Sequence, residues 1–165
     1  MIPGTIKIAE QEGVYVIKME GDVRLTLCLS FDDFIEKILS KSDYRTVIFD
    51  LTNAQAIDST TLGLMAKMSI KAGQHKHESP LVVADSPSII RLLVSMGFDD
   101  IFRLVENSEF SLPCDASETI LMLEKNGNET EVKTKVLEAH RNLMSLNAQN
   151  QSTFKELVET LEAIK

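Results

Sequence analysis

Two short apolar runs constrain the fold of this chain more than any other feature. The first occupies residues 46–51 (TVIFDL) and the second residues 81–84 (LVVA). Runs in which apolar residues do not alternate with polar ones are typical of strands buried on both faces of a parallel or mixed sheet. Apolar residues at helical spacing fill residues 60–73 between the two runs. We therefore expect an α/β fold in which helices connect neighbouring strands.

The amino-terminal segment is expected to be rich in strand. Residues 5–8 and 14–19 alternate between apolar and polar side chains, and Gly13 lies between them at the place of a hairpin turn. A third extended run is predicted from Val23 to Leu29. A mixed sheet with helices packed on it follows from this start and the later alternation of elements. The remaining elements are expected as helices over residues 30–41, 60–73 and 88–96, a loop over residues 52–58 and a last strand over residues 101–105.

Residues 107–165 differ in character from residues 1–106, and we divide the chain there. Residues 113–165 hold no strand-like run, and in their second half the apolar residues form a heptad-like stripe. The stripe predicts one long helix, or two helices that meet near residues 147–151. We expect this helical extension to pack on the domain or to mediate self-association. His140, on the apolar side, is expected to be a packed or interfacial residue. The stripe consists of Val132, Val136, Ala139, Leu143, Leu146, Asn150, Phe154, Leu157, Leu161 and Ile164.

The composition excludes several classes of protein. Lys and Arg number 17 against 25 Asp and Glu, and the resulting net charge of −8 disfavours binding to nucleic acid. No apolar run approaches the roughly 20 residues of a membrane helix, and the amino terminus lacks a signal-peptide pattern. Cys28 and Cys114 are isolated, and His75 and His77 lie in a predicted loop without a third ligand, so we expect no metal. We expect a soluble, cytoplasmic protein that does not act at a membrane.

The most informative segment is Asp58-Ser59-Thr60-Thr61, which follows the first predicted buried strand and opens a predicted helix. A side-chain oxygen of Asp58 or Ser59 can accept a hydrogen bond from a free N–H group of the first helical turn. Many helices begin with such residues for this reason alone. The motif gains specificity from its flanks, which are Phe49-Asp50-Leu51 before it and Leu62-Gly63 after it.

Together with the order of elements over residues 4–105, this signature resembles that of STAS domains, and most closely the anti-sigma factor antagonists among them. In that family the serine directly after the aspartate is the regulatory phosphoacceptor, which corresponds to Ser59 here. The resemblance implies that the unphosphorylated protein binds an anti-sigma factor that is also a serine kinase, and so releases a sigma factor. Phosphorylation of Ser59 would end this binding, and a PP2C-type phosphatase would restore it. A helix N-terminus tolerates the added charge of about −1.5 to −2, so repulsion acts mainly on the partner.

One face of the predicted helix over residues 60–73 is a candidate docking surface. Leu64, Lys67, Met68 and Lys71 share the side that is expected to face away from the sheet. An exposed face of alternating apolar and basic residues beside Ser59 suits the contact with a partner. An ordinary solvated face with a few apolar residues is the alternative.

Two positions depart from the pattern of the resembling family. Thr61 stands where most relatives have Gly, and its β-branched side chain either narrows the choice of partner or offers a second phosphoacceptor. Arg24 stands where relatives often carry an acidic residue, and it would pair with the phosphate if its loop lies beside Ser59. Both residues are therefore included in the predicted partner-binding surface, together with Asp58 and Thr60.

Enzymatic interpretations find less support in the sequence. A serine hydrolase needs the pattern Gly-x-Ser-x-Gly at its nucleophile, and the residues around Ser59 do not match it. No Gly-rich phosphate loop or dinucleotide fingerprint occurs, so we expect neither catalysis nor a cofactor. The alternative function is a structural or transporter-associated STAS subunit, in which Asp58-Ser59 only caps a helix. A small-molecule-binding module ranks third.

Overall fold

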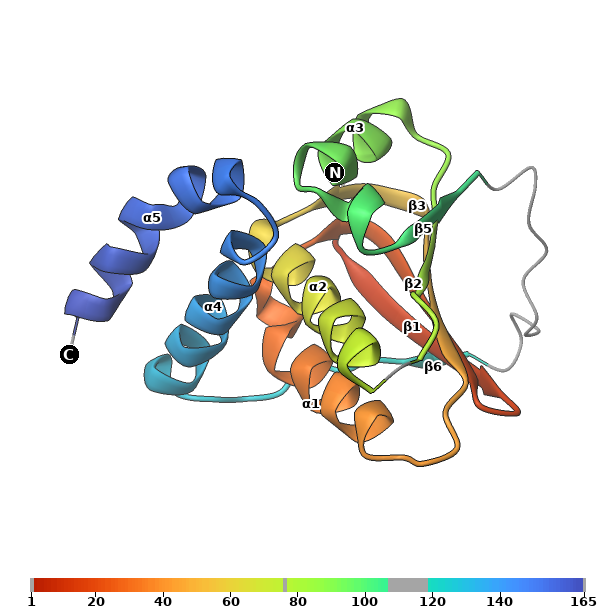
Figure 1. Ribbon diagram of the computed structural model, residues 1–165. Coiled ribbons are helices and arrows are strands. Elements are labelled where there is room, and N and C mark those ends of the chain that lie inside the picture. The colour runs from red at the N-terminus through yellow and green to blue at the C-terminus, as the bar shows by residue number, and fades with distance from the viewer. Residues whose placement is uncertain (1, 76, 107–118, 165) are drawn as a thin grey trace.

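The computed structural model describes residues 2–75, 77–106 and 119–164, and within them a six-stranded mixed sheet forms the centre of the fold (Figure 1). The strand order is β5-β4-β3-β2-β1-β6. The four strands from β2 to β5 pair in parallel, whereas β1 is antiparallel to both β2 and β6. The predicted α/β class and mixed sheet are confirmed. The strands are β1 (Thr5–Gln11), β2 (Val14–Val23), β3 (Thr46–Ile57), β4 (Leu81–Val83), β5 (Arg103–Val105) and β6 (Ile120–Leu121).

The hairpin between β1 and β2 has the turn that the sequence predicts. Glu12 and Gly13 both adopt positive φ angles, of 51° and 84°, which suits the glycine and tightens the two-residue connection. Beyond the hairpin, two predictions are wrong. β3 does not end at residue 51 but continues to Ile57, because β2 pairs with it as far as the Val23–Ile57 step. The chain after Val23 turns into a short 3₁₀ helix instead of continuing as a strand, and α1 then begins at Cys28.

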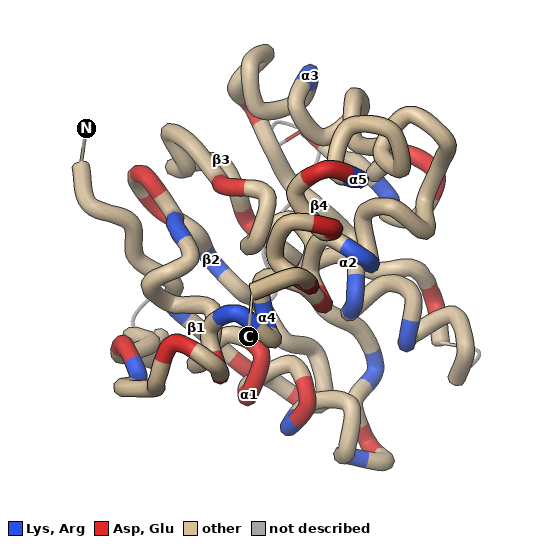
Figure 2. The backbone as a smooth tube through the Cα atoms, turned by 90° about the vertical axis from the view of Figure 1, so that its left-hand side faces the viewer, with Lys and Arg blue, Asp and Glu red and all other residues tan. Residues whose placement is uncertain are grey.

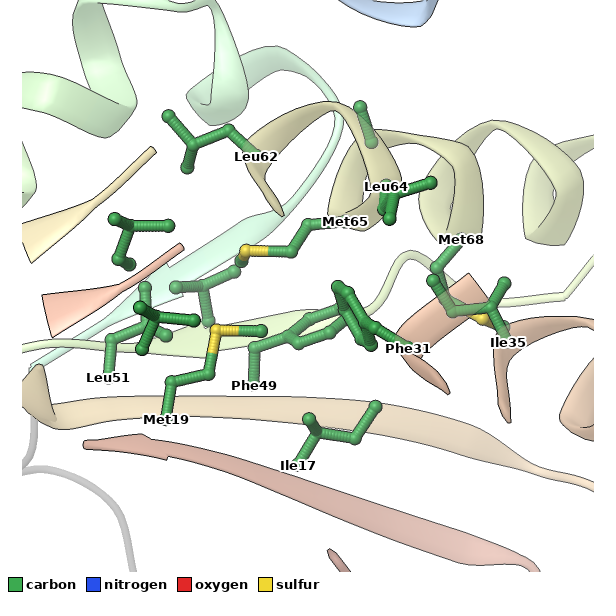
Figure 3. Packing of buried hydrophobic residues seen from close by; sticks show 14 of the residues in the cluster. Ile17, Met19, Phe31, Ile35, Phe49, Leu51, Leu62, Leu64, Met65 and Met68 are labelled. Carbon is green, nitrogen blue, oxygen red and sulfur yellow. The ribbon is translucent and has the colours of Figure 1, made fainter. Parts of the chain in front are cut away.

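Helices α1 and α2 lie side by side on one face of the sheet, and α3 contacts β3 (Figure 1). Met65 and Met68 of α2 are fully buried, and they pack among Phe31, Phe49 and other residues of the main apolar cluster (Figure 3). The helical elements are η1 (Leu25–Leu27), α1 (Cys28–Leu39), α2 (Ser59–Gln74), α3 (Pro87–Ser95), η2 (Phe98–Asp100), α4 (Glu129–Met144) and α5 (Ala148–Ala163).

The carboxy-terminal extension forms two helices that meet near Asn147, one of the two arrangements that the sequence allowed. Asn128 caps α4 and Asn147 caps α5, each accepting a hydrogen bond from the backbone N–H three residues later. The extension also contributes β6, which pairs with β1, so the prediction that residues 113–165 lack a strand is wrong. A strand of two residues is too short to show any alternation in the sequence. Cys114 lies outside the described residues.

The helical extension packs on the domain, which confirms one of the two roles that were predicted for it. α4 lies against α2 and α1 on the side away from the sheet, and α5 folds back along α4 (Figure 1). Ala139 and Leu143 of α4 are fully buried and belong to the same apolar cluster as the sheet residues. The layers are therefore the sheet, then α1 with α2, then α4 with α5.

Candidate functional site

Asp58 fixes the start of α2, as predicted for an N-cap. Its Oδ1 accepts a hydrogen bond from the backbone N–H of Thr61 at 2.9 Å. Its Oδ2 accepts another from the backbone N–H of Leu25 at 2.6 Å. One carboxylate thus satisfies a free donor of the first helical turn and ties the loop after β2 to the same point. The position of Ser59, the first residue of α2, is set by this double contact.

The side chain of Ser59 is half-buried and meets a residue from the far end of the chain. Its Oγ lies 2.7 Å from Nε2 of His140 on α4. The other ring nitrogen, Nδ1, lies 2.7 Å from the carbonyl oxygen of Val136. Because a carbonyl only accepts, Nδ1 carries a proton, and in the neutral ring Nε2 accepts the hydrogen bond from the Ser59 hydroxyl. His140 is 2% exposed and also contacts the ring of Phe154 edge-on.

One turn further along α2, Gly63 allows the backbones of α2 and α4 to touch. A Cβ atom on Gly63 would overlap the backbone carbonyl of Ala139 and would lie 2.7 Å from its Cα. The amide of Asn142 donates a hydrogen bond to the carbonyl oxygen of Gly63 at 3.2 Å. Any residue with a side chain at position 63 would therefore push α4 away from α2.

Two turns after Ser59, Lys67 joins three helices through ion pairs. Its Nζ lies 2.7 Å from Asp32 and 2.6 Å from Glu36, both on α1, and 2.6 Å from Glu138 on α4. Lys135 of α4 also binds Asp32, at 2.6 Å. Charged residues of both signs lie along these helices (Figure 2). Burial disfavours the ammonium charge, but the hydrogen bonds to these carboxylates outweigh it and raise the pKa of Lys67 above its ordinary value.

The predicted docking face is not exposed, and that expectation is corrected here. Leu64 and Met68 are 0% exposed and Lys67 is 6% exposed, while Lys71 alone among the four reaches solvent. The reason is that α2 is enclosed on every side but its carboxy-terminal end: Leu64 and Met68 join the apolar cluster, and α4 covers Lys67.

The remaining predicted site residues lie close to Ser59 but differ in access. Thr60 and Thr61 are each 3% exposed, so neither hydroxyl is open to a partner in this arrangement. Arg24 is exposed, and its guanidinium binds Asp22 at 2.8 Å. Its loop does lie beside the motif, since Leu25 is hydrogen-bonded to Asp58. Within the described ranges no group of three or more metal-binding side chains gathers, and no described helix is long and apolar enough to cross a membrane.

The sequence model of the STAS domain family matches residues 5–111. The chain belongs to this family. The motif around Ser59, strands β1 to β5 and helices α1 to α3 lie inside the matched residues of this STAS protein, whereas β6, α4 and α5 lie outside them. No curated protein matches the chain.

Solved structures agree with the family assignment at the level of the fold. An anti-sigma factor antagonist from Mycobacterium paratuberculosis is 22% identical, with a TM-score of 0.53, and the match covers 62% of this chain and 86% of that one. The unphosphorylated anti-sigma factor antagonist SpoIIAA is 13% identical, with a TM-score of 0.55 and coverage of 63% and 90%. The Bacillus cell fate determinant SpoIIAA in its phosphorylated form is also 13% identical, with a TM-score of 0.53 and coverage of 63% and 94%. The STAS fold is thus shared with anti-sigma factor antagonists.

Sequence reasoning missed the contacts that α4 makes with the motif. His140 was expected to be packed or interfacial, and it is buried, but its bond to Ser59 joins residues that are 81 positions apart. The sequence does carry a signal. Ser59, Gly63 and Lys67 recur at intervals of four, which places a polar, a small and a charged residue on one side of the helix.

Proposed function

We propose that this STAS protein is an anti-sigma factor antagonist in a partner-switching circuit. In its unphosphorylated form it binds an anti-sigma factor that is also a serine kinase, and thereby releases a sigma factor. Phosphorylation of Ser59 ends this binding, and a PP2C-type phosphatase reverses the modification. The chain itself acts by binding and catalyses no reaction, and its place of action is the cytoplasm.

The observation that carries this proposal is the position of Ser59 at the first turn of α2. Asp58 is the cap and is fully engaged by Thr61 and Leu25, so Ser59 is not needed as the cap. A phosphate on its Oγ would lie next to the free N–H groups and the positive end of the helix dipole. The helix can therefore accept the modification, while the negative charge changes what the surrounding surface attracts.

The first experiment is the intact mass of the protein purified from its own host, before and after phosphatase treatment. We expect one removable phosphate, which peptide mapping places on Ser59 and which the Ser59→Ala variant lacks. Ser86 offers a control because it also lies at the start of a helix, where it directly precedes α3 and its side chain caps it. The Ser86→Ala variant should keep the phosphate. A phosphate confined to Thr60 or Thr61, or none under any growth condition, would contradict the role of Ser59.

A second candidate function is a non-switching STAS scaffold, and one contact favours it. The hydroxyl of Ser59 already has a structural task, since it holds His140 of α4. A scaffold predicts that Ser59→Ala and Ser59→Glu differ only in stability and bind the same partners equally. A switch predicts that Ser59→Ala keeps the partner bound and Ser59→Glu releases it. Self-association through the helical extension stays a prediction in both cases.

A further inference from the structure

The face of α2 next to the proposed switch residue is occupied by a segment of the same chain. We define the α2 stripe as Ser59, Gly63 and Lys67, which lie one below the other at intervals of four residues. Each member contacts α4: Ser59 through His140, Gly63 through the backbone of Ala139, and Lys67 through Glu138. α4 thus lies along the whole stripe.

The three contacts are chemically specific, and together they describe what binds there. Gly63 requires a small residue on the opposite helix, because the backbones touch at that point. Lys67 binds a carboxylate of the opposite helix, Glu138, and Asp32 beside it binds the ammonium group of Lys135, so the two helices pair charges of both signs at this point. Ser59 requires a hydrogen-bonding side chain. The sequence Glu138-Ala139-His140 supplies all three in consecutive positions, and a helix of another protein with the same order would fit equally well.

The contact between Ser59 and α4 uses the same hydroxyl that would be phosphorylated. Its Oγ donates its proton to Nε2 at 2.7 Å, and this hydrogen bond to a ring that is 2% exposed is lost when a phosphoryl group replaces the proton. The Oγ atom of Ser59 is the nucleophile in phosphoryl transfer, so the kinase must be able to reach it. α4 therefore has to move before the phosphate is transferred.

We propose that the α2 stripe is the partner-binding surface and that α4 occupies it as an intramolecular competitor. The partner presents a helix with a small residue against Gly63 and a carboxylate against Lys67, and it displaces α4. The same displacement uncovers Ser59 for phosphorylation. α4 lies outside the family-matched residues 5–111, which is consistent with a cover that was added to the domain. This inference rests on the proposed function, because it names the surface and the regulation of that switch.

The first test measures hydrogen exchange in the full chain with Gly63→Ala. The added methyl collides with the Ala139 backbone, so we expect the amides of α4 to exchange about tenfold faster or more, while those of β2 and β3 stay as in the wild type. Gly73→Ala is the matched control on the same helix, because a Cβ there meets nothing within 4 Å. Unchanged protection of α4 in Gly63→Ala, or loss of protection in α4 and β3 together, would overturn the cover.

A second variant keeps the inference testable if Gly63→Ala does not fold. Glu138→Lys brings a positive charge to Lys67 and Lys135, from a side chain that is 32% exposed, so the sheet is left intact. We expect the same selective loss of protection in α4. Glu156→Lys, on an exposed position of α5, is the control with the same charge change and should behave as the wild type.

The binding specificity is tested with a fluorescent peptide of residues 128–146 as the probe. The full-length Glu138→Lys protein should bind it, whereas the wild type should bind at least about tenfold more weakly because its tethered α4 competes at high effective concentration. A peptide with Ala139→Leu should not bind, since the larger side chain faces Gly63. Equal binding of both peptides, or binding to wild type as strong as to the variant, would overturn the proposed surface.

The two proposals fail in different ways. Hydrogen exchange and peptide binding are measured without a kinase or a sigma factor, so they test only whether α4 covers the α2 stripe. Selective exposure of α4 without any phosphate on Ser59 in the host would leave the cover and refute the switch. Phosphate on Ser59 in the host, with α4 fully protected in both Gly63→Ala and Glu138→Lys, would leave the switch and refute the cover.

Discussion

Helix α2 is held on its two sides by different kinds of contact. Toward the sheet and α1 it presents Met65 and Met68, both fully buried in the main apolar cluster (Figure 3). Toward α4 it presents Ser59, Gly63 and Lys67, whose contacts are a hydrogen bond, a backbone approach and an ion pair. Apolar burial has no direction and is lost only when the domain opens, whereas the polar contacts on the other side can be exchanged singly for water or for a partner.

The comparison shows that one helix can belong to the apolar core on one side and hold a second helix by polar contacts on the other. α4 also adds Ala139 and Leu143 to the apolar cluster, so its interface with the domain is not purely polar. The specific contacts between α4 and α2 nevertheless lie in the α2 stripe, where a hydroxyl, a glycine and an ammonium group each meet one residue of α4. The variants below test whether the two sides of α2 respond separately, from the largest expected effect to the smallest.

The largest effect is expected on the sheet side. Met65→Ala removes a fully buried side chain and should lower the free energy of unfolding by about 2–5 kcal/mol, because a cavity remains among the residues around it. Chemical denaturation followed by circular dichroism measures the loss. Met96→Ala, at a half-buried position after α3, is the control and should lose clearly less. A loss below that of the control would contradict the central place of Met65 in the core.

The part of the fold that the sequence predicts is the part with a regular pattern. The buried strand at residues 81–84 and the helix after Asp58 appear within one residue of their predicted bounds, and β3 begins at the predicted residue 46, since a continuous apolar run and a capped helical period are local signals. Residues 52–57 (TNAQAI) carry no such pattern, and only pairing with β2 makes them a strand. β6 has only two residues, so it also carries no pattern and is a strand only because it pairs with β1.

The cap at the start of α2 could be predicted from the sequence, but the surroundings of Ser59 could not. Asp58 as cap follows from local chemistry, and the structure confirms it. That Leu64 and Met68 are covered could not be read from the helix, because its apolar residues surround it and tertiary packing decides which neighbours they meet. The contact between Ser59 and His140 depends on how the extension folds back, because the α2 stripe marks one side of the helix but does not specify which segment covers it.

On the α4 side the largest effect is expected from the ion-pair network. Lys67→Met leaves Asp32, which is 1% exposed, with Lys135 as its remaining basic partner, and should lower stability by about 3 kcal/mol. Hydrogen exchange should assign most of this loss to α4 and its neighbour α1. Lys71→Met, the same change at an exposed position of α2, should have little effect. An equal loss of protection in β2 and β3 would mean that Lys67 stabilises the core as a whole and not the contact with α4.

The contribution of Lys67 should also depend on pH in one direction only. Its pKa in the folded protein is raised above the ordinary value of 10.5, so its stabilisation is fully present below about pH 10.5 and is lost as pH rises through the higher folded pKa. The stability difference between wild type and Lys67→Met should therefore stay constant from pH 7 to about pH 10 and shrink above it. Denaturant titrations at several pH values measure this difference. A decrease that begins near neutral pH would show that the ion pairs do not hold the ammonium group.

A smaller effect is expected at the start of α2, where the two sides meet. Asp58→Ala removes the bonds to Thr61 and Leu25, and we expect a loss of about 1–2 kcal/mol, seen as a lower Tm. Ser86→Ala removes the cap of α3, which accepts one backbone hydrogen bond at the longer distance of 3.5 Å and contacts the exposed hydroxyl of Ser88, and it should lose less. Equal losses would indicate that the tie between Asp58 and the loop after β2 adds nothing.

The smallest effect is expected from the ion pair between the two helices of the extension. Arg141 and Glu162 lie 2.7 Å apart, but both side chains are about half exposed, so Glu162→Gln should change stability by about 0–0.5 kcal/mol. The buried Asn150 instead joins the two helices, because its amide donates to the carbonyls of Leu143 on α4 and Met96 beside α3. Asn150→Ala should therefore free α5, with faster exchange along its length, and Glu162→Gln should not. If Glu162→Gln also frees α5, the exposed ion pair holds the two helices of the extension together. The buried interface of α4 with α2 and the solvated interface of α5 with α4 would then no longer differ in what holds them.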